Sequence, residues 1–146
     1  MWNTYCKKVT ILDKDTWIKK LLETFQSFSQ TLPVYLHPEC REELKQLLLA
    51  SGSETAFLKK LKEFLGIISS HPKTFTNANG LEKPKGESDI YSMRFLLTDK
   101  NIRLLFAIQD GCLLCLIAFH ERSGKKVSSY SSYFPGAHAR LEDMTK

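Results

Sequence analysis

Arg94 is a charged residue in the middle of a segment that otherwise has the composition of a buried strand. Its neighbours read Tyr91-Ser92-Met93-Arg94-Phe95. A charge among residues that are expected to be buried is a local conflict, and such conflicts concentrate at functional sites. We therefore expect the chemistry of this protein in residues 90–122. The alternative is a structural arginine that pairs with a carboxylate such as Glu82 or Glu121.

Cationic and aromatic side chains alternate in and around this segment. The cations are Lys83, Lys85, Arg94, Arg103, Arg122, Lys125, Lys126 and Arg140, and the aromatic residues that follow are Tyr130, Tyr133 and Phe134. Such a pattern is typical of single-stranded RNA binding, because bases stack on aromatic rings while cations contact phosphates. The formal net charge of +5 agrees with an acidic partner, either a nucleic acid or an acidic protein. The other interpretation is a solvated basic turn, with the two tyrosines covering the core.

The cysteines offer a possible second chemistry, because residues 112–115 read Cys-Leu-Leu-Cys. On a strand, however, residues three apart point to opposite faces and lie about 10 Å apart, too far for a disulfide or a shared zinc ion. We expect buried, reduced thiols instead.

Other common site motifs are missing from the sequence. No Asp, Glu and His cluster has metal-ligand spacing, and there is no P-loop, dinucleotide-binding glycine pattern or Gly-x-Ser-x-Gly elbow. These observations argue against the common NTPases, dehydrogenases and esterases. We expect no cofactor.

Three consecutive strands are predicted to position Arg94. Asp110-Gly111 supplies the two positive-φ residues of a tight hairpin turn, so the second and third strands should pair. Side chains alternate between the faces of a strand. The core face of the first strand should therefore carry Met93 and Phe95, together with Tyr91 and Leu97, while Ser92, Arg94 and Leu96 share the opposite face.

Helices are predicted before this sheet. A short strand is expected over residues 8–12, and apolar residues then recur at helical spacing over a helical layer of about residues 15–70. Within that layer, the first helical pattern extends to Leu32, Pro38 suits the start of a second helix, and Glu54 begins a third. His71-Pro72 ends the pattern, and residues 76–88 read as a loop. The fold class is α+β.

A single domain is expected for residues 1–146, because this length and 42% hydrophobic residues suffice for one core. The longest apolar run, residues 113–119, is much shorter than the ~20 residues that cross a bilayer. The first residues have no signal-peptide pattern. We expect a soluble cytoplasmic protein with no membrane partner.

Several of these features together resemble the RelE/ParE superfamily of toxins, particularly its RelE-like and phage-derived HigB-like branches. In that family a tyrosine-x-x-arginine strand follows a Gly-Leu loop, as Tyr91 to Arg94 follow Gly80-Leu81 here. The last strand ends in a basic segment, which matches residues 118–126, and a short helix follows, which residues 137–144 resemble. The match covers about residues 76–144, whereas residues 1–75 match in element order.

The resemblance implies the toxin component of a type II toxin-antitoxin system. RelE-type members are metal-independent endoribonucleases that cut mRNA, commonly on the ribosome, by attack of the 2′-hydroxyl on the adjacent phosphate. Arg94 matches the family's strand arginine and would bind the phosphate, with Arg122, Lys125 and Lys126 completing the cationic cleft. His120 could exchange protons, and Tyr130 or Tyr133 could stack on a base or donate a proton. A histidine at the surface of a strand end is the alternative for His120.

The resemblance also implies partners and two alternative functions. A cognate antitoxin, of helix-turn-helix type and encoded by an adjacent gene, would hold the toxin, while mRNA and the ribosome would be its targets. ParE-like members use the same architecture to inhibit DNA gyrase without catalysis, and a chain of phage origin can keep the fold as an inert binding protein.

Overall fold

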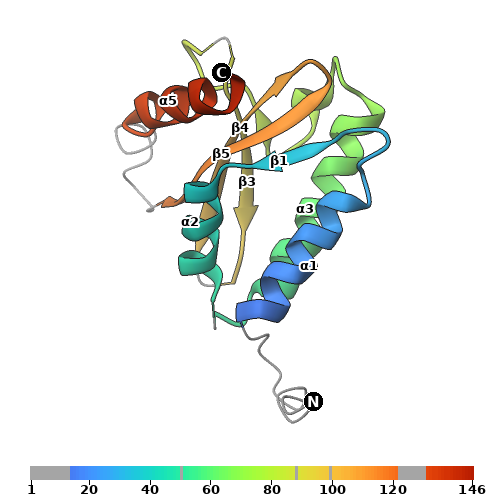
Figure 1. Ribbon diagram of the computed structural model, residues 1–146, viewed down its shortest axis with the longest axis vertical. Helices are drawn as coiled ribbons and strands as arrows, with labels where there is room; N and C mark the ends of the chain where they lie inside the picture. Colours follow the sequence, from blue (N-terminus) through green and yellow to red (C-terminus); the bar gives the residue numbers. More distant parts are fainter. Residues whose placement is uncertain (1–13, 50, 88, 99, 122–130) are drawn as a thin grey trace.

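The computed structural model describes residues 14–49, 51–87, 89–98, 100–121 and 131–146. Within these residues four α-helices and one five-stranded mixed sheet form an α+β fold (Figure 1). The predicted α+β class is therefore confirmed. The strand expected over residues 8–12 lies outside the described residues.

The sheet has the strand order β1-β5-β4-β3-β2. Its strands are β1 (Val34–Leu36), β2 (Leu81–Glu82), β3 (Tyr91–Leu96), β4 (Asn101–Gln109) and β5 (Cys112–Glu121). The strand β1 runs parallel to β5, and all other neighbours are antiparallel. The predicted three-stranded meander is thus the centre of a larger sheet.

The hairpin between β4 and β5 turns at the residues predicted for it. Asp110 has φ 53° and Gly111 has φ 78°, so both residues adopt the left-handed conformation that a type I′ turn requires. The predicted faces of β3 are also confirmed in the main, since Met93 and Phe95 are fully buried while Leu96 is 65% exposed. Ser92, on the face opposite the core, is nevertheless buried.

The prediction limited the sheet to residues 90–122, but the structure adds one strand at each edge. They are β1 and β2, with three and two residues. Runs this short carry no period-two pattern that a sequence analysis could recognise. They form because β5 and β3 are already in place as templates.

The helices are α1 (Lys14–Gln26), α2 (Pro38–Leu48), α3 (Glu54–Ser70) and α5 (Phe134–Thr145). As predicted, α2 begins at Pro38, α3 spans Glu54–Ser70, and a helix ends the chain. The first helix ends six residues before Leu32, contrary to the prediction. The Ser27 hydroxyl donates a 2.7 Å hydrogen bond to the Thr24 carbonyl there, and tight turns carry the chain on.

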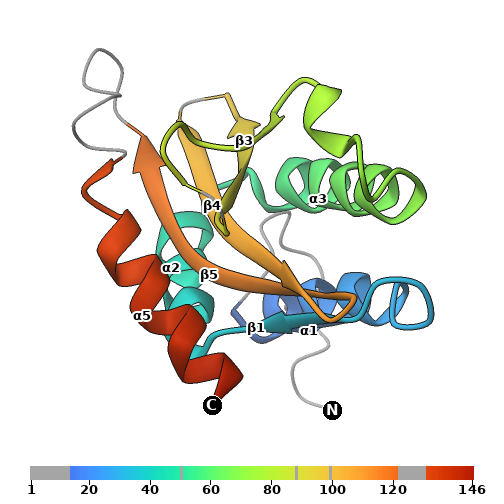
Figure 2. The same cartoon turned by 90° about the horizontal axis from the view of Figure 1, so that it is seen from above.

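The two faces of the sheet are covered by different helices. Figure 2 shows α1 and α3 on one side of the sheet and α5 on the other. None of the helices in the described ranges is long and apolar enough to cross a membrane.

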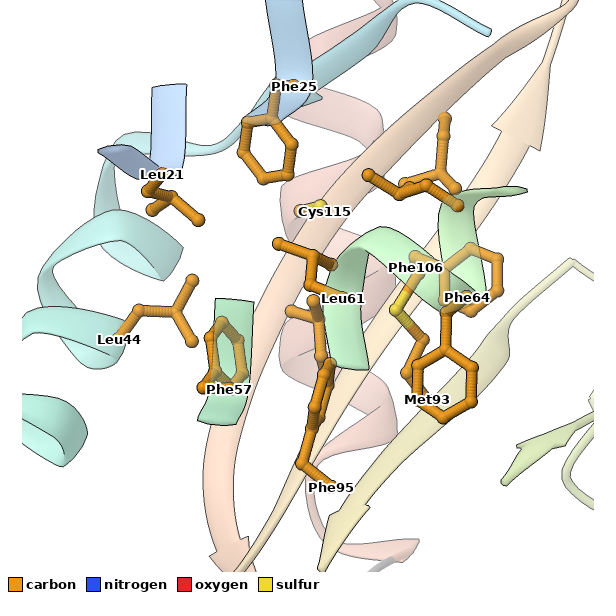
Figure 3. Packing of buried hydrophobic residues seen from close by; sticks show 14 of the residues in the cluster. Leu21, Phe25, Leu44, Phe57, Leu61, Phe64, Met93, Phe95, Phe106 and Cys115 are labelled. Carbon is orange, nitrogen blue, oxygen red and sulfur yellow. The ribbon is translucent and has the colours of Figure 1, made fainter. Parts of the chain in front are cut away.

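The main core lies between the sheet and the helices α1, α2 and α3. Figure 3 shows Phe57, Leu61 and Phe64 of α3 pointing toward Met93 and Phe95 of β3. The rings of Phe57 and Phe95 have centroids 4.3 Å apart, and those of Phe64 and Phe95 5.4 Å apart. These contacts fix α3 against β3, the strand that carries Arg94.

A smaller apolar cluster lies under α5 on the other face. Ala137 and Leu141 of α5 are buried there against Leu105 and Phe119 of the sheet. By its register Arg94 shares the face of Arg103 and Phe119, but it lies at the edge of the sheet beyond the end of β2, where it lines a cavity together with residues of α3.

Candidate nucleic-acid interface

Arg94 is half-buried in β3, and its Nε atom is buried without a hydrogen-bond partner. The side chain forms no ion pair with the described residues. It lines a cavity of about 360 Å³ together with Lys59 and Lys60 of α3 and with Asn79. A buried donor without a partner is rare in folded proteins, because burial removes its hydrogen bond to water and the loss costs free energy when no protein group replaces it. Trp17 Nε1 and Glu54 Oε2 are also buried without a partner, but Arg94 alone of the three lines this cavity, where an anion would face its guanidinium group.

The cavity exists because β2 is so short. Beyond Met93 no strand of the described residues pairs with this edge of β3, and the Arg94 amide donates instead to the Gly80 carbonyl at 2.8 Å. Gly80 has φ +96°, and a Cβ atom at this position would lie 2.8 Å from Cζ of Phe64. Only glycine fits this turn without a rearrangement. Gly80 thus brings the loop against α3 and closes one wall of the cavity.

The charged groups around the cavity leave it positive. Lys60 pairs with Glu63 at 3.3 Å, and its Nζ atom lies 5.1 Å from the centre of the Phe64 ring. Lys59 is exposed and forms no ion pair with the described residues. Three cations therefore face one carboxylate, which favours an anionic ligand.

Arg103 is engaged with protein carboxylates. Its side chain is 7% exposed and lies 3.0 Å from Glu121 and 3.2 Å from Glu82, and a third contact of 3.2 Å reaches the Ser92 hydroxyl. Glu82 and Glu121 are the two carboxylates that were considered as partners of Arg94. The structure pairs them with Arg103 instead, although Arg103 was predicted to bind RNA.

His120 and Arg94 are not brought to the same face. Arg103 lies directly opposite Arg94 on one side and Phe119 on the other, whereas His120 lies opposite Ile102. Because successive side chains alternate between faces, His120 belongs to the face of Ile102. It is exposed at the end of β5.

Arg140 joins α5 to α2 and to the edge of β5. Its guanidinium nitrogens lie 2.7 and 2.8 Å from the two carboxylate oxygens of Glu43, and one of them donates to the Leu116 carbonyl at 2.9 Å. This hydrogen bond with Glu43 raises the pKa of Arg140. Glu43 also accepts a 3.0 Å hydrogen bond from the Ala118 amide. Arg140 and Glu43 thus provide hydrogen-bond partners for the Leu116 carbonyl and the Ala118 amide, at the edge of β5 beyond the end of β1.

The remaining described candidates lie near the sheet margins. Tyr133 stacks on Phe119, with ring centroids 3.8 Å apart and an interplanar angle of 9°. Lys83 and Lys85 are exposed in the loop after β2, with Lys83 Nζ 5.9 Å from the centre of the Tyr91 ring. Arg122, Lys125, Lys126 and Tyr130 lie outside the described residues, so their place beside Arg94 stays a prediction.

The three described thiols, of Cys40, Cys112 and Cys115, form no disulfide, and Cys6 lies outside the described residues. Cys115 is buried in the main core, and burial raises its pKa to about 12. Burial, followed by the nearby Cys115, also raises the pKa of Cys40. Cys112 packs against the smaller cluster on the other face, as the alternation along β5 predicts. In the described part of the chain, no three His, Cys, Asp or Glu residues are grouped so that they could hold a metal ion.

Sequence reasoning missed Lys59 and Lys60 as candidates. They stand in Leu58-Lys59-Lys60-Leu61, where apolar residues three positions apart enclose two lysines, a spacing that indicates an amphipathic helix with a solvated face. Nothing in that pattern indicates that the solvated face of the helix lies beside Arg94.

Comparison of the chain with protein-family models, with curated proteins and with solved structures gave no match.

Proposed function

We propose that this protein binds RNA through Arg94 and acts as the endoribonuclease toxin of a type II toxin-antitoxin system, as its resemblance to the RelE/ParE superfamily implies. The observation that carries the proposal is the Arg94 guanidinium, whose buried Nε has no partner and which lines a cationic cavity. A structural arginine would be paired, as Arg103 is. The antitoxin and the ribosome are part of this proposal.

The chemistry assigned to the site is a transesterification, in which the phosphoryl group is transferred from the 5′-oxygen of the next nucleotide to the 2′-oxygen. The 2′-hydroxyl loses its proton and attacks phosphorus, the bond to the 5′-oxygen breaks, and that oxygen takes up a proton, which leaves a 2′,3′-cyclic phosphate. Arg94 would stabilise the negative charge that develops on the phosphate oxygens. No metal takes part in the mechanism that the resemblance implies.

Glu82 is the candidate base in this proposal. Its register position opposite Ser92 puts it on the same face of the sheet as Arg94. Its side chain is 42% exposed, so substrate can reach it, and Arg103 orients it from 3.2 Å. Tyr130, outside the described residues, remains the candidate donor of the proton that the leaving 5′-oxygen requires, because the register of His120 puts it on the other face of the sheet from Glu82.

A hollow with exposed apolar side chains favours a second candidate function, a toxin that acts by binding a protein such as DNA gyrase. The hollow measures about 270 Å³ and lies beside the edge strand β1. Leu22 and Tyr35 line it and are 43% and 55% exposed. No strand of the described residues pairs with the outer edge of β1, and exposed apolar side chains next to such an edge are typical of protein-binding surfaces.

Expression of the chain in a bacterial cell distinguishes the two functions. We expect growth and translation to stop within minutes of induction, with mRNA fragments that end in 2′,3′-cyclic phosphate. The Arg94→Ala protein, produced at the same level, should permit growth. Growth arrest with intact mRNA and broken DNA would favour the gyrase inhibitor, and normal growth with abundant folded wild-type protein would count against a toxin of either kind.

A further inference from the structure

A second hollow lies along the neighbouring face of α3 and shares the lining residue Lys59 with the Arg94 cavity. It measures about 560 Å³ and lies between α1 and α3, which run side by side (Figure 1). Lys20 of α1 and Lys62 of α3 line it, and so does Lys59, which also lines the Arg94 cavity. The two hollows therefore meet at Lys59.

We propose that the two hollows together form one binding track for the backbone of single-stranded RNA, running from Arg94 past Lys59 to the groove between α1 and α3. This inference rests on the proposed function, and it adds a second group of phosphate contacts to it. The track leads the RNA from the sheet edge onto the helical layer.

The charge of the track supports a polyanion. Its cations are Arg94, Lys20, Lys59, Lys60 and Lys62, and its acidic side chains are Glu23 and Glu63. Lys20, Lys59 and Lys62 are exposed and form no ion pair with the described residues. Exposed lysines that are free of carboxylate partners can release counterions when a phosphate binds, which is the main source of sequence-independent affinity for nucleic acids.

The types of side chain that line the groove between α1 and α3 argue against an acidic protein helix as the ligand there. A helix bound in a groove needs apolar pockets along the groove for its anchors, but Leu58 is the one apolar residue among the described residues that line the groove between α1 and α3. The other uncharged residues that line it, Thr24, Ser27 and Thr55, carry hydroxyl groups. A phosphate and ribose backbone suits this surface better.

The course of the track argues for a single strand. It begins at the edge of β3 and passes over α3 before it reaches α1, so the ligand must bend around a helix. A duplex is stiff over about 150 base pairs, whereas a single strand follows such a surface. The lining residues include no exposed aromatic ring, so contacts should involve the backbone and tolerate any sequence.

Binding of a fluorescent 2′-O-methyl RNA of about 20 nucleotides tests the track, since the blocked 2′-oxygen prevents cleavage. We compare Lys59→Gln/Lys62→Gln with a matched control, Lys73→Gln/Lys146→Gln, which removes two exposed lysines that line neither hollow. At about 0.1 M salt we expect the first variant to bind at least ~10-fold more weakly than the control. The slope of log affinity against log salt should fall by about 1.4, since each phosphate contact to a single strand contributes about 0.7.

Each outcome bears on a different part of the proposal. If Lys59→Gln/Lys62→Gln binds like the control while Arg94→Ala binds more weakly, the track is wrong and the phosphate contact at Arg94 stands. If the folded wild-type protein binds no RNA, both fail. Tighter binding of an oligoglutamate peptide than of RNA through Lys59 and Lys62 would assign the groove to an acidic protein and overturn the RNA track.

Discussion

The Nε atom of Arg103 donates a 3.0 Å hydrogen bond to Oε1 of Glu121, and both side chains are less than a tenth exposed. This pair joins β4 to β5 at the end of the sheet where β3 carries Arg94. Because Arg103 also contacts Glu82, its charge is neutralised inside the protein. Arg94, in the position directly opposite on β3, keeps its charge for a ligand.

Removal of the Arg103 guanidinium should destabilise the fold, because the Glu121 carboxylate would remain as a buried charge without this partner. We expect Arg103→Met to lower the free energy of unfolding by about 3 kcal/mol or more, measured by urea denaturation. The double variant Arg103→Met/Glu121→Leu should lose less than the single variant, since no buried charge is left. A loss below about 1 kcal/mol for Arg103→Met would show that the pair is not needed for stability.

Glu43 and Glu39 offer a matched comparison at Arg140. Glu43 forms two short contacts with Arg140 and accepts from the Ala118 amide, whereas Glu39 is 71% exposed and forms one contact of 3.1 Å. We expect Glu43→Gln to cost about 2 kcal/mol and Glu39→Gln less than about 0.5 kcal/mol in thermal or urea unfolding. Equal costs would contradict the role of Glu43 at the edge of β5.

Gly80 should be less tolerant of alanine than Gly86. Both have a positive φ, +96° and +85°, but a Cβ atom at Gly80 would lie 2.8 Å from Phe64, whereas at Gly86 it would meet nothing within 4 Å. The conformational cost of alanine is about 1 kcal/mol in either case. We expect an added loss of about 1–3 kcal/mol for Gly80→Ala, measured by thermal unfolding, from crowding against the ring. The same loss at both glycines would mean that Phe64 moves freely.

The raised pKa of the Cys115 thiol leads us to expect that the protein loses stability at alkaline pH. Its pKa rises from the ordinary 9.0 to about 12 on folding. Between these values the unfolded chain gives up the proton and the folded chain keeps it, so stability that is present below pH 9 falls as the pH rises, by about 1.4 kcal/mol per unit. From pH 8 to pH 10 we expect the wild type to lose about 1.4 kcal/mol more than Cys115→Ala.

A cavity variant without a thiol controls for the change in packing. Leu113→Ala removes a fully buried side chain from the same core. It should be destabilised at every pH and lose as much as the wild type between pH 8 and pH 10. If Cys115→Ala and Leu113→Ala respond to pH alike, ionisation of this thiol does not contribute.

The sequence was sufficient to predict elements whose cause is local. The turn at Asp110-Gly111 needs two positive-φ residues, and Pro38 fits the first turn of a helix, so both boundaries could be read directly. The buried and outer faces of β3 follow from alternation. In contrast, β1 has three residues and pairs with β5 far along the chain, so no local pattern reveals it.

The partners of the charged residues required the structure. Arg94 and Arg103 are both arginines in apolar strands, and their spacing gives no reason to prefer either as the free one. Only the register shows that Glu82 and Glu121 reach Arg103. Likewise, Lys59 becomes a candidate only because α3 packs beside the edge of β3.

Cleavage of RNA by the purified Arg94→Ala protein tests the phosphate contact most directly. Single-stranded RNA is incubated with the wild type, with Arg94→Ala and with Lys73→Ala as a control in an exposed lysine, and circular dichroism verifies that each is folded. We expect the wild type and Lys73→Ala to release 2′,3′-cyclic phosphate ends and Arg94→Ala to be slower on the order of a hundredfold, the usual effect of losing one preorganised electrostatic contact. Cleavage by Arg94→Ala at the wild-type rate would contradict the assignment of Arg94 as the phosphate-binding residue.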